Sequence, residues 1–101
     1  MSEAKKYQLQ DLVEKIDRVD KMIKFHSSNP SKFMLVQYEA KKEKLLSYLI
    51  DELVDAKLRS PYSFKLVFMA LNKYYPEIQK KQIPAKDKYY QELKTLEPVL
   101  A

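Results

Sequence analysis

The sequence contains no cysteine, no glycine and no tryptophan among its 101 residues. Without cysteine the chain can form neither a disulfide nor a thiolate metal site, which is typical of proteins from a reducing compartment. Without glycine it can build neither a phosphate-binding P-loop nor a Rossmann dinucleotide turn, because both need glycine where the backbone meets the ligand. Nucleotide-binding enzymes of these two classes are therefore excluded.

Long apolar runs are also missing. The longest one spans residues 66–71, whereas a transmembrane helix needs about 20 apolar residues. Residues 1–10 carry charges and lack the apolar core of a signal peptide. We therefore expect no signal peptide and no membrane partner, and we expect the protein to be cytoplasmic.

Signals for β-structure are weak throughout the chain. No segment shows sustained alternation of apolar and polar residues, and the tight hairpin turns favoured by glycine or asparagine have little to form from. A chain of this length is expected to form one domain with its own hydrophobic core. The sequence thus predicts a single all-α domain over residues 1–101.

The longest predicted element covers residues 30–58, which contain no glycine and no internal proline. At 1.5 Å per residue this stretch would make one helix of roughly 43 Å. A helix over residues 3–26 precedes it, with apolar residues at alternating spacings of three and four. The short connection between them forces antiparallel packing. We therefore predict a long antiparallel helical hairpin (residues 3–26 and 30–58), with one or two shorter C-terminal helices packed on it.

Two features of this hairpin bear on function. The outer face of the first helix carries acid-to-base pairs at i,i+4, which is typical of a solvated face; they are Asp11/Lys15, Glu14/Arg18, Asp17/Lys21 and Asp20/Lys24. Lys42 interrupts the apolar seam of the second helix. We expect its ammonium group to reach the protein edge along an apolar stem, the alternatives being a register device or a buried partner carboxylate.

A third helix is predicted over residues 61–75. Ser60 and Pro61 form an N-cap followed by a first-turn proline, and Pro76 follows the last residue. One face should pack on the hairpin, and it consists of Phe64, Val67, Phe68, Leu71, Tyr74 and Tyr75. Leu66 and Met69 point the other way, so a helix this apolar needs a second cover. Either the C-terminal segment or a second copy of the chain would supply it, and we favour the second copy.

The C-terminal segment, residues 77–101, is the loosest part of the predicted fold. Within it we expect a short helix from about residue 85 to residue 97, ended by Pro98. This helix would present Tyr89, Tyr90, Leu93 and Leu96.

Catalytic and ligand-binding patterns are absent from the sequence. His26 is the only histidine, and next to a turn it is more simply explained as a helix-end residue than as a metal ligand or catalytic base. No carboxylate pair is marked out for acid–base chemistry. We therefore predict no enzyme, no metal, no cofactor and no small-molecule substrate.

The remaining function classes are both binding functions. The favoured one is a noncatalytic protein–protein interaction or assembly module that forms a homodimer or binds another protein. Its predicted interface comprises Leu66, Met69, Tyr74, Tyr75, Tyr89 and Tyr90. The alternative is a small basic nucleic-acid-binding or regulatory protein, since lysines beside tyrosines suit single-stranded nucleic acid. Its predicted contacts are Lys80, Lys81, Lys86 and Lys88. The scarcity of arginine weighs against this alternative.

Overall fold

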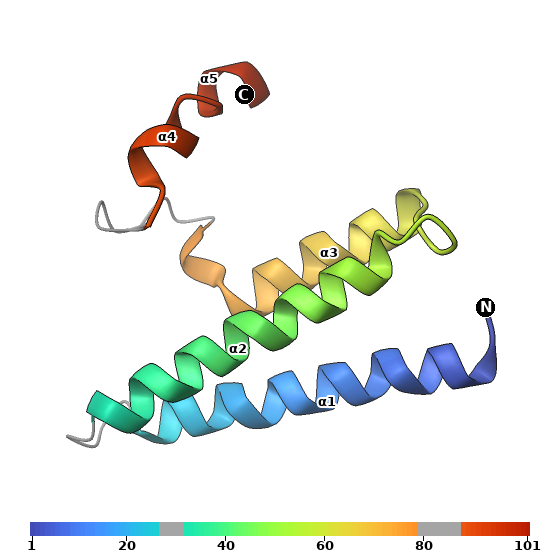
Figure 1. Ribbon diagram of the computed structural model, residues 1–101, viewed down its shortest axis with the longest axis horizontal. Coiled ribbons are helices and arrows are strands. Elements are labelled where there is room, and N and C mark those ends of the chain that lie inside the picture. The colour runs from blue at the N-terminus through green and yellow to red at the C-terminus, as the bar shows by residue number, and fades with distance from the viewer. Residues whose placement is uncertain (27–31, 79–87) are drawn as a thin grey trace.

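The computed structural model describes residues 1–26, 32–78 and 88–101, and its elements are helical throughout these ranges. They are α1 (Glu3–His26), α2 (Lys32–Leu53), α3 (Pro61–Tyr74), the 3-10 turn η1 (Pro76–Ile78), α4 (Tyr90–Lys94) and α5 (Glu97–Leu100). Helices α1 and α2 lie side by side and antiparallel, α3 packs against α2, and α4 and α5 stand apart from the hairpin (Figure 1). The predicted all-α hairpin with shorter helices is confirmed.

The hydrophobic core lies where α1, α2 and α3 meet. Ile16 of α1 is completely buried, and Tyr74 of α3 closes the core from the other side. The core residues of α2 follow the helical period and are Leu46, Leu49 and Leu53. Burying one such side chain stabilises a fold by about 1.5–3 kcal/mol. Nearer the chain's start, an ion pair between Lys5 and Glu52 holds the first turns of α1 beside the end of α2.

Helix α2 ends at Leu53 and stops short of the predicted boundary at Leu58. Asp55 is the cause. Its carboxylate accepts a hydrogen bond from the backbone N–H of Lys57 at 3.0 Å, and its carbonyl accepts from the N–H groups of Leu58 and Arg59. An aspartate that binds nearby backbone in this way competes with the helix and favours a turn. The chain therefore reverses here and leads into α3.

The start of α3 at Pro61 is confirmed, and a reciprocal cap explains it. The Ser60 hydroxyl accepts from the Ser63 N–H at 3.2 Å, and the Ser63 hydroxyl accepts from the Ser60 N–H at 2.7 Å. Serine thus takes the place that glutamate usually occupies in a capping box. Pro61 fits the first turn because no helical hydrogen bond needs its missing N–H.

The rotation of α3 differs from the prediction. Ser63 and Tyr74 are buried, with Val67 and Ala70 between them at helical spacing, whereas Phe64 and Phe68 are more than half exposed. The expectation that both phenylalanines pack on α2 was wrong. The cap at Ser63 and the hydrogen bond of Tyr74 to α1 fix the two ends of the buried stripe. The rings of Phe64 and Phe68 therefore lie at the edge of the surface through which α3 packs on the core.

The C-terminal helix is also divided differently from the prediction. Instead of one helix ended by Pro98, the structure has α4 and then α5, and Pro98 lies in the first turn of α5. Proline is tolerated at this position, so it starts a helical turn here and does not end one. The first predicted residues of that helix, 85–87, lie outside the described residues.

Candidate functional site

An apolar groove runs between α1 and α3, with α2 as its floor. Its volume is about 770 Å³. The lining residues are Leu9, Gln10, Val13 and Glu14 of α1, Leu49 and Leu53 of α2, and Leu66, Met69, Ala70, Lys73 and Tyr74 of α3. The groove exists because α1 and α3 both pack on α2, while their own side chains leave space between them.

One end of the groove is closed by a polar cluster that joins α3 to α1. The Tyr74 hydroxyl donates a hydrogen bond to Asp17 Oδ1 at 2.6 Å, and Lys73 Nζ lies 3.2 Å from the same oxygen. The Tyr74 hydrogen bond lowers the pKa of the Asp17 carboxyl, against the opposing effect of partial burial, and Lys73 adds to the lowering. Burial and the bond to Asp17 raise the pKa of Tyr74. The tyrosine therefore stays protonated and acts as a donor.

A second polar cluster lies on the same side of α1. Lys42 Nζ is 2.9 Å from Asp20 Oδ1 and 4.4 Å from the centre of the Tyr75 ring, and the Lys42 side chain is only 8% exposed. The expectation that Lys42 reaches the protein edge was wrong. A buried carboxylate partner, one of the alternatives, is present. Burial, with the nearby carboxylates Glu39 and Glu43 adding to it, raises the pKa of Tyr75 to about 12.

Sequence reasoning missed the roles of Asp17 and Asp20. Both were assigned to the solvated face of α1, and the pair of Asp20 with Lys24 does form, at 3.3 Å. Each aspartate nevertheless turns toward a neighbouring helix. The signal was available, because the two residues directly follow the buried Ile16 and Val19. Residues beside a seam position lie at its edge, within reach of the facing helix.

The structure divides the predicted protein interface among separate places. Leu66 and Met69 line the groove and are 37% and 52% exposed. Tyr74 also lines the groove but is buried in the core, and Tyr75 packs against the core with Lys42 over its ring. Tyr89 and Tyr90 belong to the C-terminal segment, which stands apart from the groove (Figure 1). Leu66 and Met69 are therefore the predicted interface residues that share one open surface.

The predicted nucleic-acid contacts are only partly described. Lys80, Lys81 and Lys86 lie outside the described residues. Lys88 Nζ lies 5.3 Å from the centre of the Tyr89 ring, and Lys94 Nζ lies 5.2 Å from that of Tyr90. Each lysine thus lies over one face of a neighbouring tyrosine ring.

His26 is the last residue of α1, as expected. Its ring stacks on that of Tyr38, with 5.4 Å between the centres, and meets the edge of Phe25 at 5.2 Å. In the described part of the chain, no group of three or more histidine or acidic side chains could hold a metal ion. Within residues 1–26, 32–78 and 88–101, no helix combines the length and apolar character needed to cross a bilayer.

Comparison of the chain with protein-family models, with curated proteins and with solved structures found no match.

Proposed function

We propose that this protein is a noncatalytic helical interaction module that self-associates and uses the groove between α1 and α3 as its contact surface. The observation that carries the proposal is the exposed apolar wall formed by Leu66 and Met69. Leu49 and Leu53 lie behind it as a preformed apolar floor. Two helices that flank such a floor offer the surface on which an amphipathic helix docks. A cysteine-free chain suits work in a reducing compartment such as the cytoplasm.

Binding, not catalysis, suits the polar groups of the groove. Lys73 and Tyr74 both bind Asp17, and the raised pKa of Tyr74 keeps its proton in place. The remaining polar lining residues are Gln10 and Glu14. Glu14 is exposed and pairs with Arg18. Lys73, Tyr74 and Glu14 are thus each engaged with a partner inside the fold.

Nucleic-acid binding is the alternative, and the groove makes it the weaker one. Protein association uses apolar surface, and the groove supplies it. The predicted nucleic-acid contacts are Lys80, Lys81, Lys86 and Lys88, and of these the structure describes Lys88, whose ammonium group lies over the Tyr89 ring.

The proposal is tested by placing a charge in the groove. Leu66→Glu puts a carboxylate where an apolar contact would form, which costs several kcal/mol unless the carboxylate returns to water. Light scattering should give the wild type at about twice the chain mass of 12.0 kDa and the variant at 12.0 kDa, with its helical circular dichroism intact.

Asn72→Glu is the matched control. It makes the same change of charge on the same helix at an exposed position outside the groove, so its mass should equal that of the wild type. If Asn72→Glu dissociates the protein as fully as Leu66→Glu, general charge repulsion explains the effect and the groove does not.

A further inference from the structure

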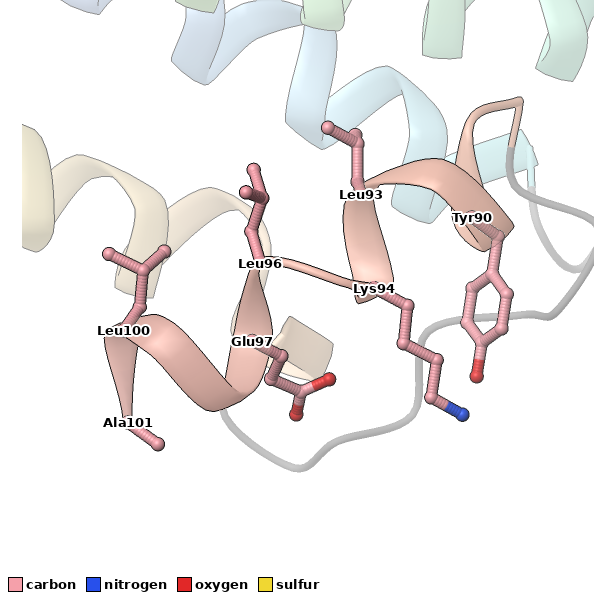
Figure 2. Close-up of a pocket in the computed structure, with 7 residues that line it drawn as sticks. All are labelled: Tyr90, Leu93, Lys94, Leu96, Glu97, Leu100 and Ala101. Carbon is pink, nitrogen blue, oxygen red and sulfur yellow. The ribbon is translucent and has the colours of Figure 1, made fainter.

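The C-terminal segment carries an apolar ridge that is exposed. Leu93, Leu96 and Leu100 point to one side of α4 and α5, and Tyr90 and Lys94 point to the other (Figure 2). The three leucines are 56%, 51% and 82% exposed. An open hollow of about 540 Å³ is lined by the three leucines together with Tyr90, Lys94, Glu97 and Ala101. A short helical segment with one leucine face is typical of a ligand for a helical groove.

The ridge and the groove match in charge as well as in apolar character. At 100° per residue, Glu92 and Lys94 project to opposite flanks of Leu93. The groove has Glu14 on its α1 wall and Lys73 on its α3 wall, and both side chains are more than half exposed. With Leu93 in the groove, one orientation of the segment places Glu92 beside Lys73 and Lys94 beside Glu14. Opposite charges on both walls favour this orientation over its reverse.

Within one molecule the two surfaces do not meet. All residues lining the groove come from α1, α2 and α3, and the C-terminal segment lies apart from them (Figure 1). A surface and its complement on one chain can pair between two copies, each giving one segment and receiving one. Such a reciprocal exchange closes after two molecules. It would also cover Leu66 and Met69, the exposed residues of the α3 wall.

We propose that the groove between α1 and α3 binds the leucine ridge of α4 and α5 from a second copy of the chain. This inference rests on the proposed self-association and names the segment that fills the groove. It differs from a dimer in which two α3 helices pack face to face. In such a dimer Met69 would lie near its own symmetry mate, whereas in the exchanged dimer it lies near the ridge.

Disulfide trapping tests the proposal cleanly, because the chain has no cysteine of its own. Met69→Cys and Leu96→Cys are prepared as separate full-length variants; both positions are half exposed, so folding should tolerate the change. The two variants are mixed, left to exchange and then oxidised. The mixture should form a covalent dimer with about twice the 12.0 kDa chain mass, and reduction should reverse it. On a denaturing, non-reducing gel, each variant oxidised alone should run at the mass of one chain, because no disulfide joins the two copies.

The outcomes separate this inference from the proposed function. A disulfide dimer from Met69→Cys alone would show α3 against α3, which overturns the exchange and leaves self-association standing. A wild type that is monomeric by light scattering would overturn both. The double variant Met69→Cys/Leu96→Cys adds a check for closure within one chain. A disulfide-closed monomer in place of a covalent dimer would show that the ridge binds its own groove, against the proposal.

Discussion

The buried ion pair between Lys42 and Asp20 makes an asymmetric prediction about stability. Asp20→Asn removes the carboxylate that pairs with the buried Lys42 ammonium group, while the ring of Tyr75 stays beside it. Removing one partner of a buried ion pair lowers the free energy of unfolding by about 3–5 kcal/mol, because the other charge stays buried without an opposite charge. Lys42→Met leaves Asp20 with a second cation, since Lys24 lies 3.3 Å away, and methionine fills the space of the lysine stem. We expect this variant to cost about 1 kcal/mol.

The measurement is urea unfolding followed by circular dichroism. All variants are compared at one protein concentration, because association would make stability depend on concentration. The double variant Asp20→Asn/Lys42→Met should be about as stable as Lys42→Met alone, so the coupling energy should equal the whole cost of Asp20→Asn, about 3–5 kcal/mol. If Asp20→Asn cost no more than Lys42→Met, the ammonium group would not be buried in the folded protein and this explanation would be refuted.

Two further predictions concern the polar cluster at Asp17 and the nucleic-acid alternative. Tyr74→Phe should lower the free energy of unfolding by about 1–3 kcal/mol at pH 7, measured by urea unfolding, because it removes a hydrogen bond to a charged group. The folded-state pKa of Asp17 lies below its ordinary 3.8, so the contribution of this carboxylate to the free energy of unfolding is present above pH 3.8 and is lost as the pH falls further. The folded-state pKa of Tyr74 lies above its ordinary 10.0, so the contribution of this hydroxyl is lost as the pH rises beyond 10.0. In Tyr74→Phe the free energy of unfolding should therefore fall less at both the acid and the alkaline end of the pH range. Equal pH profiles for the variant and the wild type would contradict this. For nucleic acid, micromolar protein at about 50 mM salt should give no mobility shift with single-stranded oligonucleotides; a shift that weakens with salt, and weakens further in Lys88→Gln, would favour the alternative.

The helical hairpin could be predicted because its signals are local. The apolar spacing of residues 3–26 and the Ser60–Pro61 start signal need no knowledge of the tertiary fold, and both are confirmed. The end of α2 was not predicted, because Asp55 had to be recognised as a residue that binds its own backbone. Proline was overvalued as a stop at Pro98, where its position in the first turn makes it compatible with α5.

The candidate site was only partly predictable, because it depends on how α3 is rotated. The sequence showed that α3 is apolar on two sides and that Leu66 and Met69 lack cover. It did not show which residues of the predicted face meet α2, since Phe64 and Phe68 compete with the smaller Val67 for that contact. The hydrogen bond between Tyr74 and Asp17 fixes the rotation of α3, and it joins residues that are far apart in the chain. Burial of Lys42 depends on Asp20 in the same way.

The mass of the wild-type chain in solution tests the central claim most directly. Sedimentation equilibrium over a range of micromolar concentrations should fit a monomer–dimer equilibrium, with the limiting mass at about twice 12.0 kDa. In the proposed dimer, burial of two leucine ridges in two grooves would provide the apolar contact for this association. A mass of 12.0 kDa at every concentration would contradict self-association through the groove.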